Sequence, residues 1–140
     1  TRPPQSPYDI LIVDAGSDKG VKIADRVFLP LGPEIGQVSD VFSSTAKVKL
    51  FSSNGVITPA VLERHNVPVD IEGIGAGNFK IVVPRDIEVQ AGDRILSAYV
   101  SSDLLAIVEN VELKPTDSFK EILARSPANI FSLRFLVIKP

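Results

Sequence analysis

The stretch EGIGAGNFKIVVP has glycines at three alternate positions, Gly73, Gly75 and Gly77. Closely spaced glycines can form a loop whose backbone N–H groups bind a phosphate, which would indicate a nucleotide-binding protein. The dinucleotide motif G-x-G-x-x-G, however, requires a glycine where this chain has Asn78, and it must open a helix. An alternating, β-branched run follows instead. The sequence therefore predicts a hairpin turn between two strands and no bound cofactor.

The single histidine, His65, is the side chain best suited to acid–base catalysis near neutral pH. A serine hydrolase would combine it with an aspartate and an activated serine. Candidates follow in that order: Asp70, Asp86 and Asp93, then Ser97, Ser101 and Ser102. None of these serines has the flanking glycines that shape a nucleophile turn. His65 between Arg64 and Asn66 fits an exposed hairpin tip, so we predict no catalytic residue.

Metal-binding residues are few, because the chain has no cysteine and one histidine. Asp14, Asp18 and Asp25 lack the spacing of a calcium-binding loop. The first two are more consistent with a turn around Gly16, and the sequence singles out no pair of carboxylates for catalysis. We predict no metal site.

Nucleic-acid binding by a β-barrel requires a basic groove interleaved with aromatic side chains. The chain has 15 basic and 17 acidic residues, a formal net charge of −2. Lys47, Lys49 and Phe51 share one predicted strand face, and Lys80 follows Phe79, but no basic stripe continues across strands. These lysines fit the solvated faces of edge strands. We expect no nucleic-acid partner.

The elements that must position these residues are short apolar segments separated by Gly, Pro, Ser and Asn. We predict strands at 8–15, 26–29, 35–42, 46–51, 67–74, 79–84, 93–100, 104–113 and 132–138. The segment at 46–51 alternates most clearly, with Ala46, Val48 and Leu50 facing inward. At 57–66, Thr58-Pro59 fits either a helix start or an edge strand. We favour the strand, because a strictly alternating segment follows.

One segment, TDSFKEILARSP, predicts a short helix near the C-terminus. Ser118 and Glu121 have capping-box spacing, and Phe119, Ile122 and Leu123 form an apolar stripe. With about ten short strands and frequent turns, the chain is predicted to be an all-β sandwich or pair of barrels.

Length and composition fit a soluble globular chain: 140 residues, 44% hydrophobic and 23% charged. No apolar run is long enough to cross a membrane, and no signal peptide opens the sequence. Residues 1–7 have the composition of a linker remnant. We expect a change of subdomain near 50–57 and consider that the C-terminal segment returns to the first subdomain.

Several stretches together resemble the extracytoplasmic β-rich region of the MreC family, the bacterial rod shape-determining proteins. They are YDILIVDAGSDKGVKIADRVFLP, IGQVSDVFSSTAKVKLFSS, IEGIGAGNF and VPRDIEVQAGDRILS, in that order. The matching turn positions are Asp14, Gly16, Gly20, Val21, Asp25, Gly36, Gly73, Gly75, Gly77, Val89, Gly92 and Asp93. The closing DSFKEILARSPANIFSLRFLVI is also similar. After Asp93 the family's Thr-Ser-Gly and Phe-Pro-x-Gly-type turns are missing, which indicates a divergent member.

This resemblance implies two small β-barrel-like subdomains, preceded in the full protein by a membrane helix and a coiled coil. It implies a non-enzymatic, self-associating scaffold at the periplasmic face of the cytoplasmic membrane. The implied partners are the elongation-specific penicillin-binding protein, MreD, RodA and the actin-like MreB.

Three apolar residues are candidate partner contacts, Leu31, Phe51 and Tyr99, since each lies on a predicted turn or outer face. The alternative for all three is ordinary packing between subdomains. Two other functions remain open at this point: a generic ligand- or nucleic-acid-binding barrel, and a hydrolase built on two barrels.

Overall fold

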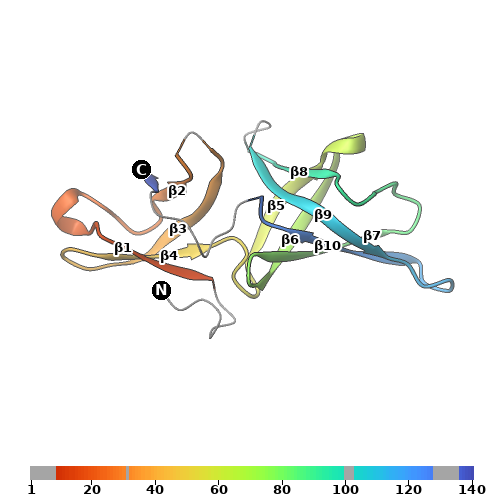
Figure 1. The fold of residues 1–140 in the computed structure, drawn as a ribbon, viewed down its shortest axis with the longest axis horizontal. Helices are drawn as coiled ribbons and strands as arrows, with labels where there is room; N and C mark the ends of the chain where they lie inside the picture. The colour runs from red at the N-terminus through yellow and green to blue at the C-terminus, as the bar shows by residue number, and fades with distance from the viewer. Residues whose placement is uncertain (1–8, 31, 100–102, 128–135) are drawn as a thin grey trace.

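The chain folds into two antiparallel β-sheets that lie side by side along the longest axis of the molecule (Figure 1). The structure, a computed structural model, describes residues 9–30, 32–99, 103–127 and 136–140. Within these ranges, strands and turns account for almost the whole chain, with two single-turn 3₁₀ segments. The prediction of an all-β fold is confirmed.

The first sheet has five strands in the order β1-β4-β3-β2-β11. These are β1 (Ile10–Val13), β2 (Arg26–Phe28), β3 (Glu34–Val41), β4 (Ala46–Leu50) and β11 (Val137–Lys139). A 3₁₀ turn, η2 (Ser17–Lys19), follows β1 and ends at Gly20 in the left-handed conformation. The last described strand, β11, thus pairs with β2 near the start of the chain.

One face of this sheet carries its hydrophobic core. Ala46, Val48 and Leu50 on β4 are almost fully buried, while Lys49 between them is exposed. The predicted alternation of β4 is therefore confirmed. Val27 and Val38 from the neighbouring strands pack into the same cluster.

The second sheet is a closed barrel with the strand order β10-β7-β6-β5-β8-β9. Its strands are β5 (Ile57–Leu62), β6 (Val67–Gly75), β7 (Asn78–Pro84), β8 (Arg94–Ser97), β9 (Leu104–Glu112) and β10 (Phe119–Arg125). The ambiguous segment at 57–66 is strand β5 followed by the 3₁₀ turn η3 (Glu63–His65). Its prediction as a strand is confirmed.

The barrel interior is filled by aliphatic side chains and one phenylalanine. Ile71, Ile81, Ile95 and Ile122 are fully buried, and Phe79 is nearly so. Because these residues come from four different strands, the core forms only when the barrel closes.

The predicted helix near the C-terminus is wrong, because this segment is strand β10. It pairs with β7 on one side and β9 on the other, and Ile122 and Ala124 point into the core. A strand with partners on both sides satisfies its backbone hydrogen bonds while burying two core residues. This tertiary gain outweighs the helix signal of Ser118 and Glu121.

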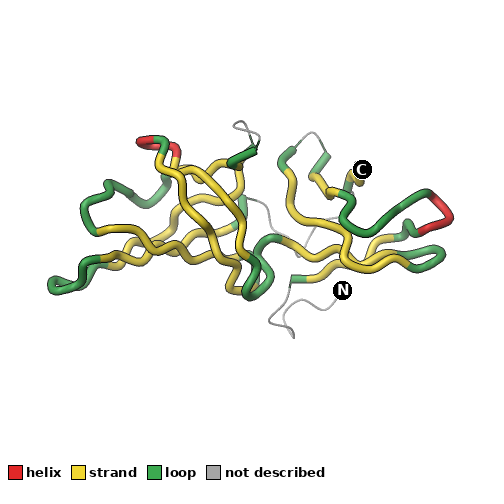
Figure 2. Tube along the Cα trace, turned by 180° about the vertical axis from the view of Figure 1, so that it is seen from behind, coloured by secondary structure: helices red, strands yellow, loops and turns green. Residues whose placement is uncertain are grey.

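The chain passes from the first sheet to the barrel through residues 51–56 (Figure 2). Backbone hydrogen bonds hold this connection against β6. Gly55 N–H donates to the carbonyl of Gly73, and Gly75 N–H donates to the carbonyl of Ser52, at 2.9 and 2.8 Å. A Cβ at Gly73 would lie 2.2 Å from the carbonyl oxygen of Ser53. The connection is therefore packed directly against β6.

Candidate functional site

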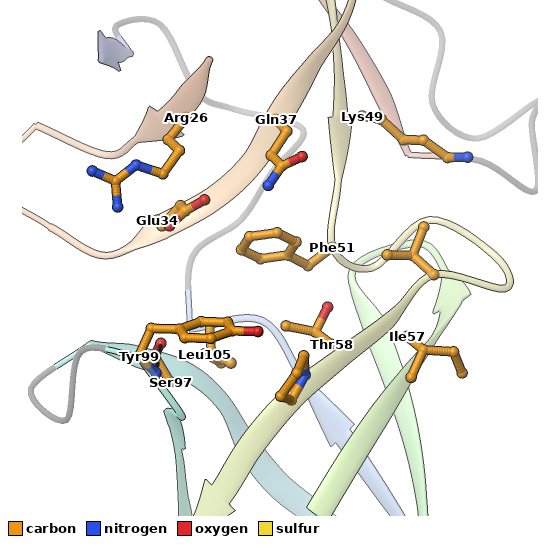
Figure 3. A pocket seen from close by; sticks show the side chains of 12 residues that line it. Arg26, Glu34, Gln37, Lys49, Phe51, Ile57, Thr58, Ser97, Tyr99 and Leu105 are labelled. Atoms are coloured by element: carbon orange, nitrogen blue, oxygen red, sulfur yellow. Dashed lines mark hydrogen bonds between the residues drawn. The ribbon is translucent and has the colours of Figure 1, made fainter. Parts of the chain in front are cut away.

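An open cleft of about 480 Å³ lies where the five-stranded sheet meets the barrel (Figure 3). Its sheet wall comes from β2, β3 and β4, and its barrel wall comes from β5, the end of β8 and β9. The lining residues are Arg26, Glu34, Gln37, Lys49, Phe51, Val56, Ile57, Thr58, Pro59, Ser97, Tyr99 and Leu105. The cleft thus combines apolar lining residues with charged groups on its sheet wall.

Two of the three predicted partner-contact residues, Phe51 and Tyr99, line this same cleft. Phe51 follows β4, donates its N–H to the carbonyl of Ile35 at 3.0 Å, and packs against the barrel core. Tyr99 is 81% exposed, and in Figure 3 its ring lies across the cleft from the Phe51 ring. Leu31 lies outside the described residues. The role of all three as partner contacts stays a prediction.

The charged groups that line the cleft lie on its sheet wall. Burial raises the pKa of the Glu34 carboxyl above its ordinary value, an effect that the positive charge of Arg26 opposes and Asp103 reinforces. The Arg26 guanidinium lies 5.5 Å from the centre of the Phe28 ring, and the Lys139 ammonium lies 4.9 Å from it. The Phe28 ring therefore lies close to two cations, one of which, Arg26, lines the cleft.

Away from this cleft, the two sheets are joined through the buried carboxylate of Asp9, just before β1. Asp9 accepts hydrogen bonds from Ala76 N–H at 2.9 Å and Gly77 N–H at 2.7 Å, and from the Ser52 hydroxyl. Only 1% of Asp9 is exposed. The glycine-rich turn thus does bind an anion, but that anion is the chain's own carboxylate. By fixing the barrel against the sheet, Asp9 helps to set the geometry of the cleft.

Sequence reasoning missed Asp9, because its partners lie 67 and 68 residues away along the chain. The available signal was the turn itself. Gly75, Ala76 and Gly77 all have positive φ, which directs successive N–H groups to one side, as in an anion-binding nest. Nothing local identifies the carboxylate that occupies it.

The other singled-out glycines fall into two groups. Gly20 and Gly92 have positive φ. Gly16 and Gly36 lie against backbone, where a Cβ would meet the carbonyl oxygens of Phe42 and Lys49 at 2.2 and 2.4 Å. Asp93, after Gly92, accepts hydrogen bonds from Arg64 and from the N–H of Gln90. These residues thus shape turns and close backbone contacts, and none of them lines the cleft.

His65 lies on the exposed β5–β6 tip, within η3, and its Nε2 is 2.9 Å from Oε1 of Glu88. This partner is an exposed glutamate rather than a serine, so the geometry gives a catalytic triad no support. Within the described ranges, no three His, Asp or Glu side chains gather in a way that would hold a metal ion. None of the described helical segments has the length and apolar character needed to cross a membrane.

A family model described as "Rod shape-determining protein MreC, barrel core" matches residues 1–139. The chain belongs to the MreC family. No curated protein sequence matches it. Membership in this family makes the chain a rod shape-determining protein, and it agrees with the resemblance seen in the sequence.

Solved MreC structures share the fold of this chain at low sequence identity. MreC from Pseudomonas aeruginosa is 20% identical with a TM-score of 0.85, covering 96% of this chain and 91% of that one. MreC from Listeria monocytogenes is 22% identical with a TM-score of 0.76, covering 99% and 71%. A major periplasmic domain of the cell shape-determining filament MreC is 19% identical with a TM-score of 0.62, covering 88% and 80%.

Proposed function

We propose that this MreC-family chain is a non-enzymatic scaffold of the cell-elongation machinery, which recruits enzymes of peptidoglycan synthesis through the cleft between its two sheets. The observation that carries the proposal is the meeting of Phe51 and Tyr99 across this cleft. Family membership supplies the biological setting.

The chemistry of the cleft favours protein binding. Aromatic side chains bury a large area at low entropic cost and are frequent among the residues that dominate binding energy. Tyr99, at 81% exposed, is an unusually open aromatic beside a half-buried one, so a partner side chain inserted there would be desolvated on both sides. Val56, Pro59 and Leu105 also line the cleft and add apolar surface.

We further propose that the full protein works at the periplasmic face of the cytoplasmic membrane, held by a segment outside this sequence. Its proposed partners are the elongation-specific penicillin-binding protein, MreD, RodA and MreB, together with further copies of itself. Support comes from the family match and from the solved structure described as a major periplasmic domain.

Biolayer interferometry of this chain against the periplasmic region of the elongation-specific penicillin-binding protein from the same organism tests the proposal. We expect saturable binding, and no binding to the division-specific homologue. Tyr99→Ala should weaken binding about tenfold or more, since removing a central aromatic commonly costs over 1 kcal/mol.

Phe42→Ala is the matched control, because Phe42 is also an exposed aromatic, at 51%, but does not line the cleft. Equal loss of affinity in both variants, with circular dichroism unchanged, would place the binding surface elsewhere. Absence of any binding by the folded chain, also after restoration of a coiled coil upstream, would contradict recruitment itself.

A further inference from the structure

The barrel is incompletely paired where it faces the cleft. Strand β5 pairs with β6 from Ile57 to Leu62, but its ladder with β8 covers only Ala60 to Leu62. In the described part of the chain, no strand continues the ladder beside residues 57–59. These three residues line the cleft, so one edge of a β-strand opens into it.

The composition of this stretch is typical of a strand at the edge of a sheet. Pro59 cannot donate a backbone hydrogen bond, and proline in sheets is typically confined to edges. Along residues 57–59, Pro59 can offer an added strand only its carbonyl oxygen. An incoming extended segment would add backbone contacts here and find Tyr99 beside it.

The sheet wall opposite carries three cations, Lys49, Arg26 and Lys139, in one cross-strand row. Register places Ile10, Lys49, Gln37, Arg26 and Lys139 opposite one another across the five strands, so their side chains share the outer face. Arg26 and Lys49 line the cleft directly. The row thus extends from Lys139 on the edge strand β11 to the two cations that line the cleft.

Two of these cations repel each other in the folded protein. Arg26 and Lys139 are directly opposite each other on β2 and β11, and both lie over the Phe28 ring. Like charges directly opposite in a sheet repel. Glu34 offsets part of this charge, and a carboxylate from a bound segment would offset more.

We propose that the cleft receives an extended, acidic segment of a partner protein, which adds a strand along residues 57–59. One apolar side chain of this segment lies between Phe51 and Tyr99, and an acidic side chain faces Arg26. The inference rests on the proposed recruitment function and specifies the chemistry of what is recruited.

Titration of the ¹⁵N-labelled chain with a short capped peptide of alternating glutamate and leucine tests this by NMR. We expect the largest amide shifts at Ile57, Thr58, Tyr99 and Arg26. The same peptide with lysine in place of glutamate should bind at least about tenfold more weakly. Arg26→Glu should weaken binding of the acidic peptide similarly, whereas Lys114→Glu, on an exposed loop after β9, should not.

Equal affinity for both peptides, or shifts confined to other surfaces, would overturn the inference. So would shifts at the cleft produced by phosphatidylglycerol vesicles but not by the acidic peptide. The interferometry assay separates this failure from that of the proposed function. If the penicillin-binding protein binds wild type and Arg26→Glu equally while Tyr99→Ala abolishes binding, recruitment stands and the acidic segment is excluded.

Discussion

The carboxylate of Asp93 ties together two segments of the barrel that are far apart in sequence. Arg64 donates from Nε to Oδ2 at 2.8 Å and from Nη2 to Oδ1 at 2.7 Å, and Gln90 N–H donates to Oδ2 at 2.9 Å. The hydrogen bonds from Arg64, together with that from Gln90, hold the pKa of Asp93 below its ordinary value. A carboxylate with a lowered pKa in the folded state stabilises the fold only while it is ionised.

Asp93→Asn should therefore lower the free energy of unfolding at pH 7 by about 1 kcal/mol, a value that allows for solvent screening of this surface pair. The contribution of Asp93 is fully present above its unfolded-state pKa, ordinarily 3.8, and is lost as pH falls through the lower folded-state value. The difference between wild type and variant should thus shrink below about pH 4. Urea unfolding at several pH values measures this.

Asp86→Asn is the control, since Asp86 is an exposed aspartate in the turn that follows β7. It should change stability little at any pH. A difference between wild type and Asp93→Asn that stays constant down to about pH 2 would contradict a role for the ionised carboxylate.

At the residue scale, the sequence identified some candidate side chains but not the contacts that they make in the fold. Phe51 and Tyr99 were identifiable as candidate contacts, because aromatics on outer faces are visible in a strand pattern. Their meeting in one cleft was not, since it depends on how two sheets pack. Asp9 gave no signal at all, because an aspartate before an apolar strand is ordinary and its binding turn begins 67 residues away.

At the scale of elements, alternation predicted strands well wherever one face is buried and the other solvated, as in β4. It failed in β10, where Phe119, Ile122 and Leu123 satisfy a helical stripe while Ile122 and Ala124 satisfy a strand. Both patterns fit so short a segment. Only the neighbouring strands β7 and β9, which offer hydrogen bonds on both sides, decide between them.

The close contact between β6 and residues 51–56 predicts that position 73 requires glycine. Gly73→Ala should lower the free energy of unfolding by about 3 kcal/mol or more, because its Cβ would meet backbone oxygens of Ser53 and Phe51 at 2.2 and 2.6 Å. Backbone atoms in a packed connection cannot move aside as a flexible side chain would. Chemical denaturation of the purified variant measures the loss.

Gly20→Ala provides the comparison. Gly20 has a φ of +81°, and a Cβ added there would have no heavy atom within 4 Å apart from its chain neighbours. The substitution should therefore cost only the left-handed backbone strain, about 1–2 kcal/mol. If Gly73→Ala proves no more harmful than Gly20→Ala, then β6 and residues 51–53 are not in rigid contact.

At the scale of the whole molecule, the proposed recruitment depends on how the sheet and the barrel are held, because the cleft has one wall from each. The attachments in the described residues include the connection through residues 51–56 and the hydrogen bonds of Asp9 to Ala76 and Gly77. The chain also crosses back from β10 in the barrel to β11 in the sheet. The connection through residues 51–56 is covalent but narrow. We expect the Asp9 contacts to restrain the rotation of one sheet relative to the other, because they join residues just before β1 to the β6–β7 turn.

Asp9→Ala should therefore broaden the distribution of distances between the two sheets without unfolding either. The absence of native cysteine allows spin labels at Asp18→Cys, on η2, and Lys114→Cys, beyond β9, to be placed specifically. Pulsed electron–electron double resonance should give a narrow distribution in the parent and a wider or shifted one after Asp9→Ala. If the proposed recruitment through the cleft is correct, affinity for the penicillin-binding protein should fall in parallel, since the two cleft walls no longer keep their spacing.

Asp25→Ala separates this effect from simple loss of stability. Asp25 is also a buried aspartate, but it accepts from Lys22 N–H at 2.9 Å within the five-stranded part of the chain. Its replacement should destabilise that part and leave the distance distribution unchanged. An unchanged distribution in Asp9→Ala as well would mean that contacts other than those of Asp9 set the geometry of the cleft, and that the carboxylate serves only to fill the turn.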